Sequence, residues 1–126
     1  MVFDNAVEIR LSKDYISLDN VYNLYKTDTI NYYNIIGSLF VRNRRIGDKV
    51  TLNGVNKSLK KLFIDKKIPK EYRNVIPIIS DEQGIIYVPF VGVADRVKAK
   101  LLQTSLYVST IFNSIDKERW MSSDEK

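Results

Sequence analysis

The sequence contains no cysteine and no histidine among its 126 residues. Without cysteine there are no disulfide bonds and no thiolate metal sites, so hydrophobic burial must stabilise the fold. Without histidine the chain lacks the commonest general base and the commonest metal ligand. The five glycines are scattered and form neither a G-x-x-x-x-G-K nor a G-x-G-x-x-G phosphate loop. These residues therefore do not indicate catalysis by this chain alone.

Long apolar runs are also lacking. The longest nearly apolar stretch, Ile85 to Ala94, is interrupted by Pro89 and Gly92 and is about half as long as the roughly 20 residues of a membrane-spanning helix. The first residues have neither the positive start nor the apolar core of a secretory signal. A chain of this length with 44% apolar side chains can bury one core. We therefore expect one soluble, cytoplasmic domain without a membrane partner.

Positive charge, by contrast, is concentrated in one window, from Val41 to Pro77. This window holds eleven of the twenty Lys and Arg residues but three of the fifteen acids, so it carries +8 and the other segments together carry −3. Such a cluster is typical of a surface that binds a polyanion. The cations beside a predicted turn are Arg42, Arg44 and Arg45, and those on one face of a predicted helix are Lys57, Lys60 and Lys61. They could contact successive phosphates, but a solvated helix face and strand edge would explain them equally well.

Four tyrosines lie close together in the sequence: Tyr22, Tyr25, Tyr32 and Tyr33. Stacking on unpaired bases is one interpretation. We favour core or half-buried sheet positions, because the amphipathic tyrosine ring suits a partly buried sheet. The adjacent acids Asp81 and Glu82 lie in a predicted loop, and we interpret them as solvated turn residues rather than as acid–base partners or Mg²⁺ ligands.

Most of the chain has the period-two alternation or the β-branched and aromatic content of strands. The single strands predicted on this basis are Val7–Leu11, Tyr15–Leu18, Thr29–Ile36, Leu39–Arg45, Lys49–Leu52 and Ser105–Phe112. Two apolar runs, Val75–Ser80 and Ile85–Phe90, flank a polar loop that ends in Gly84, and this arrangement predicts a β-hairpin.

One segment has helical spacing. Leu59, Leu62 and Phe63 follow i, i+3, i+4 spacing and predict an amphipathic helix whose opposite face is basic. Asn56 and Ser58 are the two candidates for its N-cap.

Several further segments have weaker patterns. Ile64 falls on the basic side of the predicted helix and does not fit the amphipathic pattern. We read Asn53-Gly54 as a loop leading into that helix rather than as a hairpin turn. A short helix or turn is predicted at Val21–Lys26 and a second short helix at Pro69–Arg73. Together the elements predict an α+β fold, a single compact domain over residues 1–115 with mixed β-sandwich-like sheets and one or two short helices, followed by a frayed polar tail at 116–126.

Several motifs occur in an order that resembles a known family. They read V-R-N-R-R-x-G-D at Val41–Asp48, K-K-L-F-I-D-K-K-I-P at Lys60–Pro69, R-N-V-I-P-I-I-x-D-x-x-G-I-I-Y-V at Arg73–Val88, and V-A-D-R-V-K at Val93–Lys98. Over residues 30–112 this order resembles the C-terminal domain of bacterial tRNA(Ile)-lysidine synthetase. The chain departs from the family pattern at Ile46, where the family usually has Pro, and at Tyr87, where it often has Trp.

The resemblance implies a non-catalytic module whose fold is similar to a domain of the bacterial phenylalanyl-tRNA synthetase β chain. It implies that the module binds isoleucine tRNA at the acceptor arm, while a separate N-terminal domain of the same parent chain attaches lysine to the wobble cytidine. That catalytic domain carries an S-G-G-x-D-S loop and would hold ATP and Mg²⁺; because the loop is absent here, we expect a fragment of the ligase without a cofactor of its own. The tRNA-binding residues that match by position are Arg42, Arg44, Arg45, Lys60, Lys61, Lys66 and Lys67. The alternative is a module that braces the catalytic domain and has little tRNA affinity.

Overall fold

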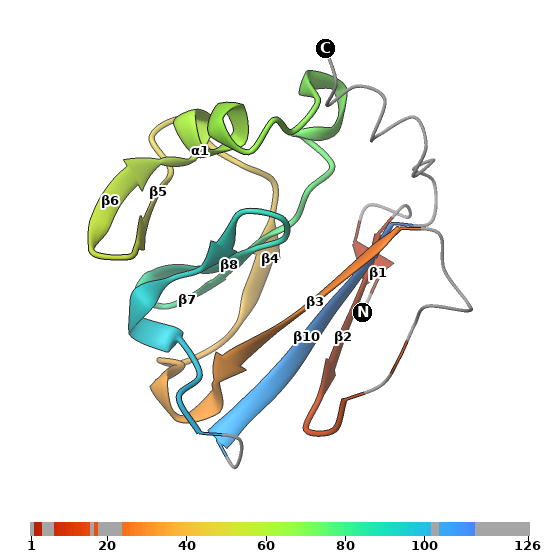
Figure 1. Ribbon diagram of the computed structural model, residues 1–126, viewed down its shortest axis with the longest axis vertical. Coiled ribbons are helices and arrows are strands. Elements are labelled where there is room, and N and C mark those ends of the chain that lie inside the picture. Colours follow the sequence, from red (N-terminus) through yellow and green to blue (C-terminus); the bar gives the residue numbers. More distant parts are fainter. Residues whose placement is uncertain (1, 4–6, 16, 18–23, 102–103, 113–126) are drawn as a thin grey trace.

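The computed structural model describes residues 2–3, 7–15, 17, 24–101 and 104–112. Within them, two antiparallel sheets face each other, and a hairpin and one α-helix lie at the upper end of the second sheet (Figure 1). The strand-rich α+β class and the single small domain are thereby confirmed. The predicted tail, the first half of the predicted helix at Val21–Lys26, and Ile16 and Leu18 of the predicted strand at Tyr15–Leu18 lie outside the described residues; Tyr15 and Ser17 are not in a strand.

The first sheet has the strand order β1-β2-β10-β3. Its strands are β1 (Val2–Phe3), β2 (Val7–Ser12), β10 (Ser105–Phe112) and β3 (Tyr25–Asn31). The central strand β10 pairs with β2 and with β3 along most of its length. Successive side chains of β10 alternate between faces, so Val108 is buried in the core whereas its neighbour Tyr107 lies on the other face, half-buried. The predictions for β2 and β10 are confirmed.

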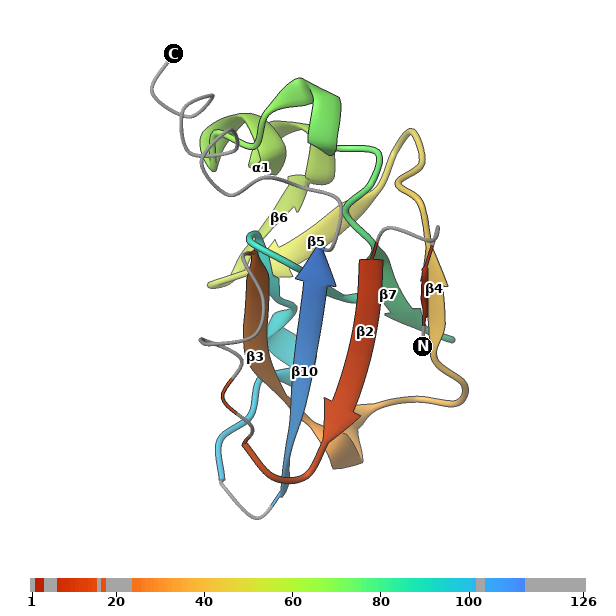
Figure 2. The same cartoon turned by 90° about the vertical axis from the view of Figure 1, so that its right-hand side faces the viewer.

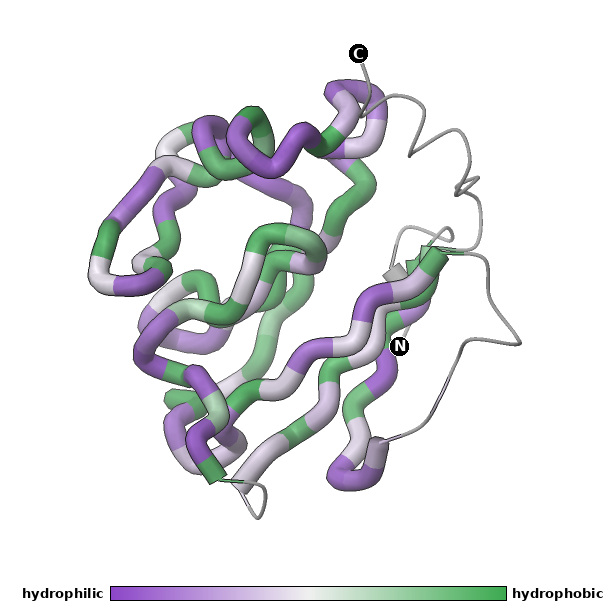
Figure 3. Tube along the Cα trace, viewed as in Figure 1, coloured by the Kyte–Doolittle hydropathy of each residue, from purple (hydrophilic) through white to green (hydrophobic). Residues whose placement is uncertain are grey.

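The second sheet has the order β4-β7-β8-β9. Its strands are β4 (Phe40–Arg42), β7 (Ile78–Asp81), β8 (Gly84–Val88) and β9 (Gly92–Val93). β7 and β8 form the predicted hairpin, although β7 begins three residues later than expected. Its residues are buried almost without a break, and Figure 3 shows hydrophobic positions concentrated on this sheet, in contrast to the alternation along β3 and β10. The β7–β8 hairpin at the centre of the sheet is therefore covered on both faces.

The prediction of a loop at Asn53-Gly54 is wrong. These two residues have φ values of 50° and 80° and connect β5 (Lys49–Leu52) with β6 (Val55–Ser58) in an antiparallel hairpin. Asn and Gly tolerate the left-handed region that a tight primed turn requires. The hairpin therefore occupies the residues that we expected to lead into the helix.

The amphipathic helix α1 spans Leu59–Asp65. Leu59, Leu62 and Phe63 are buried as predicted, and Ile64 is exposed to solvent. Of the two candidate N-caps, Ser58 is the residue used: its Oγ accepts a hydrogen bond from the Lys61 N–H at 3.2 Å. Asn56 lies instead in β6, opposite Thr51.

The region between the first and second sheets corrects two further predictions. β3 begins at Tyr25, in part of the segment that we predicted to be helical, and ends at Asn31. There the Asn31 Oδ1 accepts the Tyr33 N–H at 3.1 Å and starts a 3-10 helix, Tyr32–Asn34, so the strand predicted to reach Ile36 stops five residues early.

Two segments differ from their predicted lengths by only a few residues. The strand predicted at Leu39–Arg45 covers only β4, and the helix predicted at Pro69–Arg73 is the 3-10 helix Lys70–Tyr72. A third 3-10 helix, Asp95–Val97, follows β9.

A hydrogen bond between the two sheets crosses the core. The Tyr87 hydroxyl in β8 donates to the Asp28 Oδ2 in β3 at 2.6 Å, and the Tyr87 side chain is fully buried. Burial, followed by the negative charge of Asp28, raises the pKa of Tyr87 well above its ordinary value. The phenol therefore stays protonated and acts as a donor, which fixes the position of β3 over the second sheet.

Asp81 is buried, contrary to its interpretation as a solvated turn residue. Its carboxylate accepts two hydrogen bonds from the Arg96 guanidinium, at 2.6 and 2.9 Å, and one from the Ile36 N–H at 2.9 Å. It also accepts the amides of Gln83 and Gly84 within the β7–β8 turn. The Arg96 guanidinium, together with these amides, holds the pKa of Asp81 well below its ordinary value.

We predict that Asp81→Asn lowers the free energy of unfolding by roughly 2 to 4 kcal/mol at pH 7, because the amide replaces an acceptor with a donor facing Arg96 and Ile36. Since the folded pKa of Asp81 lies below its unfolded value, its stabilising contribution is complete above about pH 4 and decreases as the pH falls further. Urea unfolding at pH 7 and pH 3 measures both effects. The matched control is Glu82→Gln, an exposed acid in the same turn; equal losses in the two variants would contradict the prediction.

Candidate nucleic-acid interface

The turn between β4 and β5 is held by an ion pair. Arg42 Nη1 and Nη2 donate to Asp48 Oδ2 and Oδ1 at 3.0 and 2.9 Å, and the Arg45 N–H donates to the same carboxylate at 2.7 Å. Gly47, at φ 88°, allows the chain to reverse there. Burial acts to raise the pKa of Asp48, but the hydrogen bonds from Arg42 and from the Arg45 amide outweigh it, so the pKa lies below its ordinary value. The turn is therefore ordered around a charged carboxylate.

This turn forms one wall of a surface concavity of about 640 Å³, which we call the basic concavity. Arg44 and Arg45 line it from the turn, and Lys60 lines it from α1. The start of α1 is joined to the turn by a hydrogen bond from the Leu59 N–H to the Asp48 carbonyl at 2.8 Å. Three cations from two elements therefore face one hollow, and Arg42 neutralises the carboxylate of Asp48 beside them.

Arg44 is held in place before any ligand binds. Its Nε donates to the Asn74 Oδ1 at 2.9 Å, and its guanidinium carbon lies 5.8 Å from the centroid of the Phe63 ring. A guanidinium held over an aromatic ring by a cation–π contact keeps its remaining N–H donors available. Arg44 can therefore present donors to an anion with little further loss of conformational freedom.

The structure brings together three of the eight predicted site residues and places the others elsewhere. Arg44, Arg45 and Lys60 line the basic concavity, whereas Arg42 lies beside it and binds Asp48. The remaining four do not line it: Lys57 is half-buried in β6, Lys61 is exposed on α1, and Lys66 and Lys67 are exposed just after α1 ends.

Sequence reasoning missed the residues that position the cations, Asp48 and Asn74. The signal for Asp48 was available, since an acid directly after a glycine turn, six residues from Arg42, is suited to bind the turn amides and that arginine. Asn74 gave no such signal, because its contact with Arg44 spans thirty residues. Also unforeseen is Ile46, fully exposed at the tip of the turn and lining the concavity.

The favoured interpretation of the tyrosines is wrong for two of them. Tyr32 and Tyr33 are 52% and 74% exposed and contact each other edge to face, with ring centroids 5.5 Å apart. Tyr25 is half-buried in β3 as expected, and Tyr22 lies outside the described residues. Two exposed tyrosines side by side belong to the surface rather than to the core.

Two classes of site are not found in the part of the chain that the structure describes. No three acidic side chains come together there to hold a metal ion. No helix there is long and apolar enough to cross a membrane.

A family model described as the TilS substrate C-terminal domain matches residues 39–109, which include the whole basic concavity. The chain belongs to this family. The resemblance that we drew from the motifs is thereby confirmed; the match ends three residues before the predicted limit at residue 112 and begins nine residues after the predicted start at residue 30. The basic turn, α1 and the β7–β8 hairpin of this chain all lie within the matched residues.

Curated relatives and a solved structure agree with this assignment. The tRNA(Ile)-lysidine synthase of Clostridioides difficile is 43% identical over 68 residues, covering 54% of this chain and 15% of that protein. That of Thermotoga maritima is 30% identical over 95 residues, covering 75% of this chain and 22% of that protein. A crystal structure of a TilS C-terminal domain superposes with a TM-score of 0.58 at 26% identity, covering 87% of this chain and 84% of that one. The chain thus spans about a fifth of the length of these curated relatives.

We predict that Asp48→Asn loosens the turn and accelerates hydrogen exchange of the Arg45 amide, because that amide and Arg42 lose their charged acceptor. The free energy of unfolding should fall by about 1 to 3 kcal/mol. Exchange measured by NMR and urea unfolding check the two effects. Asp65→Asn, an exposed acid at the end of α1, is the control with the same change in charge. If the hydrogen-exchange rate of the Arg45 amide is the same in both variants as in the unmodified chain, Asp48 does not order the turn.

Proposed function

We propose that this chain is the tRNA-binding module of a tRNA(Ile)-lysidine synthase and that the basic concavity binds the phosphate backbone of the tRNA. The observation that carries the proposal is the convergence of Arg44, Arg45 and Lys60 on one hollow whose single carboxylate is already paired with Arg42. Solvated lysines on a helix face would not need an arginine held by Phe63 and Asn74, nor a turn ordered by an ion pair. Membership of the TilS family supports RNA as the polyanion.

Recognition in this proposal depends on charge and shape. The deep major groove of A-form RNA hides the edges of the bases, so a protein that binds the duplex contacts phosphates and riboses. Arg44 and Arg45 supply planar guanidinium groups for phosphate oxygens, and Lys60 supplies a point charge. The acceptor arm of an isoleucine tRNA is the partner that we propose for this surface.

The module would work with a catalytic domain elsewhere in the same parent chain. In this proposal that domain uses ATP and Mg²⁺ to attach lysine to the wobble cytidine. This chain binds the tRNA and contributes no catalytic group. The name of the relatives and the small share of their length that this chain covers support such a division.

A second function, bracing the catalytic domain, is favoured by a different feature. An apolar groove of about 530 Å³ lies between the two sheets and is lined by Leu11 of β2, by Val41 of β4 and by Leu39 just before β4. The rest of the parent chain is the natural occupant, because about four-fifths of the length of the relatives lies outside this domain. Leu11→Asp should then abolish binding of a separately produced catalytic part and leave the affinity for tRNA unchanged; unchanged binding of the catalytic part rules out this groove.

The test of tRNA binding compares two variants with the same loss of charge. Arg45→Gln with Lys60→Gln removes two cations of the basic concavity, and Lys66→Gln with Lys67→Gln removes two exposed cations that do not line it. We predict that the first pair lowers the affinity for isoleucine tRNA at least tenfold and reduces the salt slope by about two units, roughly one per lost phosphate contact. The second pair should change the affinity less than threefold.

Filter binding across a salt titration measures both quantities. Equal losses in the two variants would mean that diffuse charge binds the tRNA and that the concavity is not the site. No salt-dependent affinity in the unmodified chain would reject the function.

A further inference from the structure

Two strands of the first sheet, β3 and β10, carry tyrosine and hydroxyl side chains rather than charged side chains on their solvent-facing side. Figure 2 shows this side of the sheet toward the viewer. Because β3 and β10 pair with Thr29 opposite Tyr107 and Thr27 opposite Ser109, these four side chains share one face. The hydroxyls of Thr27 and Ser109 are 3.0 Å apart. The other face of the same strands packs on the core.

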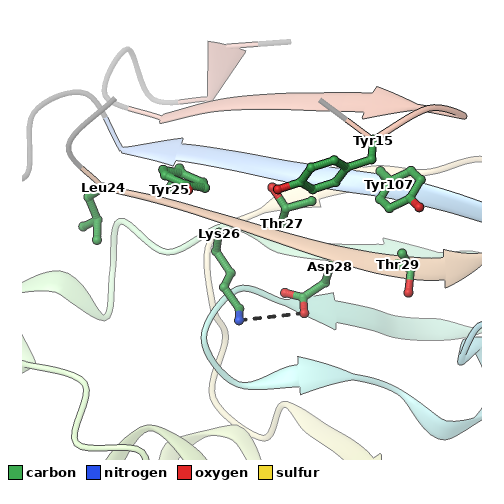
Figure 4. A pocket seen from close by; sticks show the side chains of 8 residues that line it. All are labelled: Tyr15, Leu24, Tyr25, Lys26, Thr27, Asp28, Thr29 and Tyr107. Atoms are coloured by element: carbon green, nitrogen blue, oxygen red, sulfur yellow. Dashed lines mark ion pairs between the residues drawn. The ribbon is translucent and has the colours of Figure 1, made fainter. Parts of the chain in front are cut away.

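Tyr15 turns this surface into a hollow. It follows β2, is 62% exposed, and contacts Tyr107 edge to face with ring centroids 5.7 Å apart. Figure 4 shows the Tyr15 ring lying over β3 beside Thr27, with Tyr25 further along the strand. The hollow that these residues line measures about 530 Å³.

The charged residues of the hollow compensate each other. Lys26 and Asp28 lie on the opposite side of β3 from Tyr15 and form an ion pair at 4.0 Å (Figure 4). The tyrosine side is therefore formed by π-faces and hydroxyl donors and acceptors, without net charge. This chemistry does not suit a phosphate, but it does suit a nucleobase, which stacks through its ring and forms hydrogen bonds through its edges.

The same strip continues past the end of β3. Tyr32 and Tyr33 follow directly after Asn31, and a second hollow there, of about 370 Å³, is lined by both tyrosines and by Lys13 and Asp14. From Tyr25 to Asn31 the strand extends for roughly 20 Å. The strip is thus long enough for more than one nucleotide, and the one cation and one acid at its end carry no net charge.

We propose that this tyrosine platform, formed by Tyr15, Tyr25 and Tyr107 and extended by Tyr32 and Tyr33, stacks unpaired nucleotides of the bound RNA. A four-stranded antiparallel sheet that displays aromatic rings on its open face is a general solution for binding single-stranded RNA. The choice of RNA as ligand rests on the proposed function. The platform adds a second contact that depends on stacking rather than on charge. The basic concavity binds phosphates of a duplex, and the platform binds bases that are not paired.

The experiment measures binding of fluorescein-labelled octacytidylate, a single-stranded RNA, by fluorescence anisotropy. Tyr15→Ala with Tyr107→Thr removes two rings and keeps a good strand former in β10. Tyr15→Phe with Tyr107→Phe is the matched control that keeps both rings. We expect the first variant to lose at least fivefold in affinity with an unchanged salt slope, and the second to stay within twofold. Tyr15→Ala alone, outside any strand, should lose at least threefold and avoids a change in the sheet.

The proposal is overturned if the unmodified chain does not bind octacytidylate, if removal of the rings has no effect, or if the Phe variant loses as much as the variant without rings. It is also overturned if removal of the rings weakens binding to the catalytic part of the parent chain while RNA binding is unchanged, because the platform is then a protein contact.

A further comparison separates this proposal from the proposed function. Isoleucine tRNA is tested with its unpaired 3′ nucleotides intact and removed. If the platform binds that end, removal and the loss of the rings should each weaken binding and should not add, whereas Arg45→Gln with Lys60→Gln should weaken both forms of the tRNA. If tRNA binding fails but octacytidylate binding depends on the rings, the platform stands and the proposed function falls. If tRNA binding depends on the concavity but octacytidylate binding does not depend on the rings, the platform falls alone.

Discussion

The buried carboxylate of Asp81 is the constraint on which the arrangement of the loops depends. It joins the β7–β8 turn, the segment that leads into β4 and the 3-10 helix that contains Arg96. A charge in such a position is tolerated because every lone-pair direction has a donor. The Tyr87–Asp28 hydrogen bond performs a similar task between the two sheets. The polar contacts thus define a geometry that an apolar core alone would leave loose.

Acidic residues also determine which cations of the basic surface have fixed positions. A window with eleven bases and three acids would be positive in any conformation, but only an ordered surface holds its cations at fixed spacing. Asp48 is one of the three acids. Its ion pair with Arg42 neutralises a charge that would repel phosphate, and its carboxylate also accepts the Arg45 N–H and so fixes the backbone of the turn. The cost in net charge is one cation, and the gain is a turn whose amides and side chains have defined positions.

The sequence predicted those elements whose own periodicity is strong. The apolar stripe of α1, the alternation in β10 and the two apolar runs of the β7–β8 hairpin each follow from local pattern and are present. The failures have tertiary causes. Asn53-Gly54 had two permitted outcomes, and only the pairing of β5 with β6 decides between them. Asp81 looked solvated because its partner Arg96 is fifteen residues away. For the same reason, membership of a basic window did not show which cations would share a hollow.

The cation–π contact of Arg44 with Phe63 joins the core to the surface at one point. Phe63 is fully buried and belongs to the stripe that anchors α1, the helix that also carries Lys60. Its ring therefore serves two purposes, packing on one side and orienting a cation on another. If the basic concavity binds RNA as proposed, a mutational screen scored by RNA binding alone would rank Phe63 with the contact residues, although its ring is fully buried. A screen scored by protein abundance would rank it with the core, and either score by itself would misread the position.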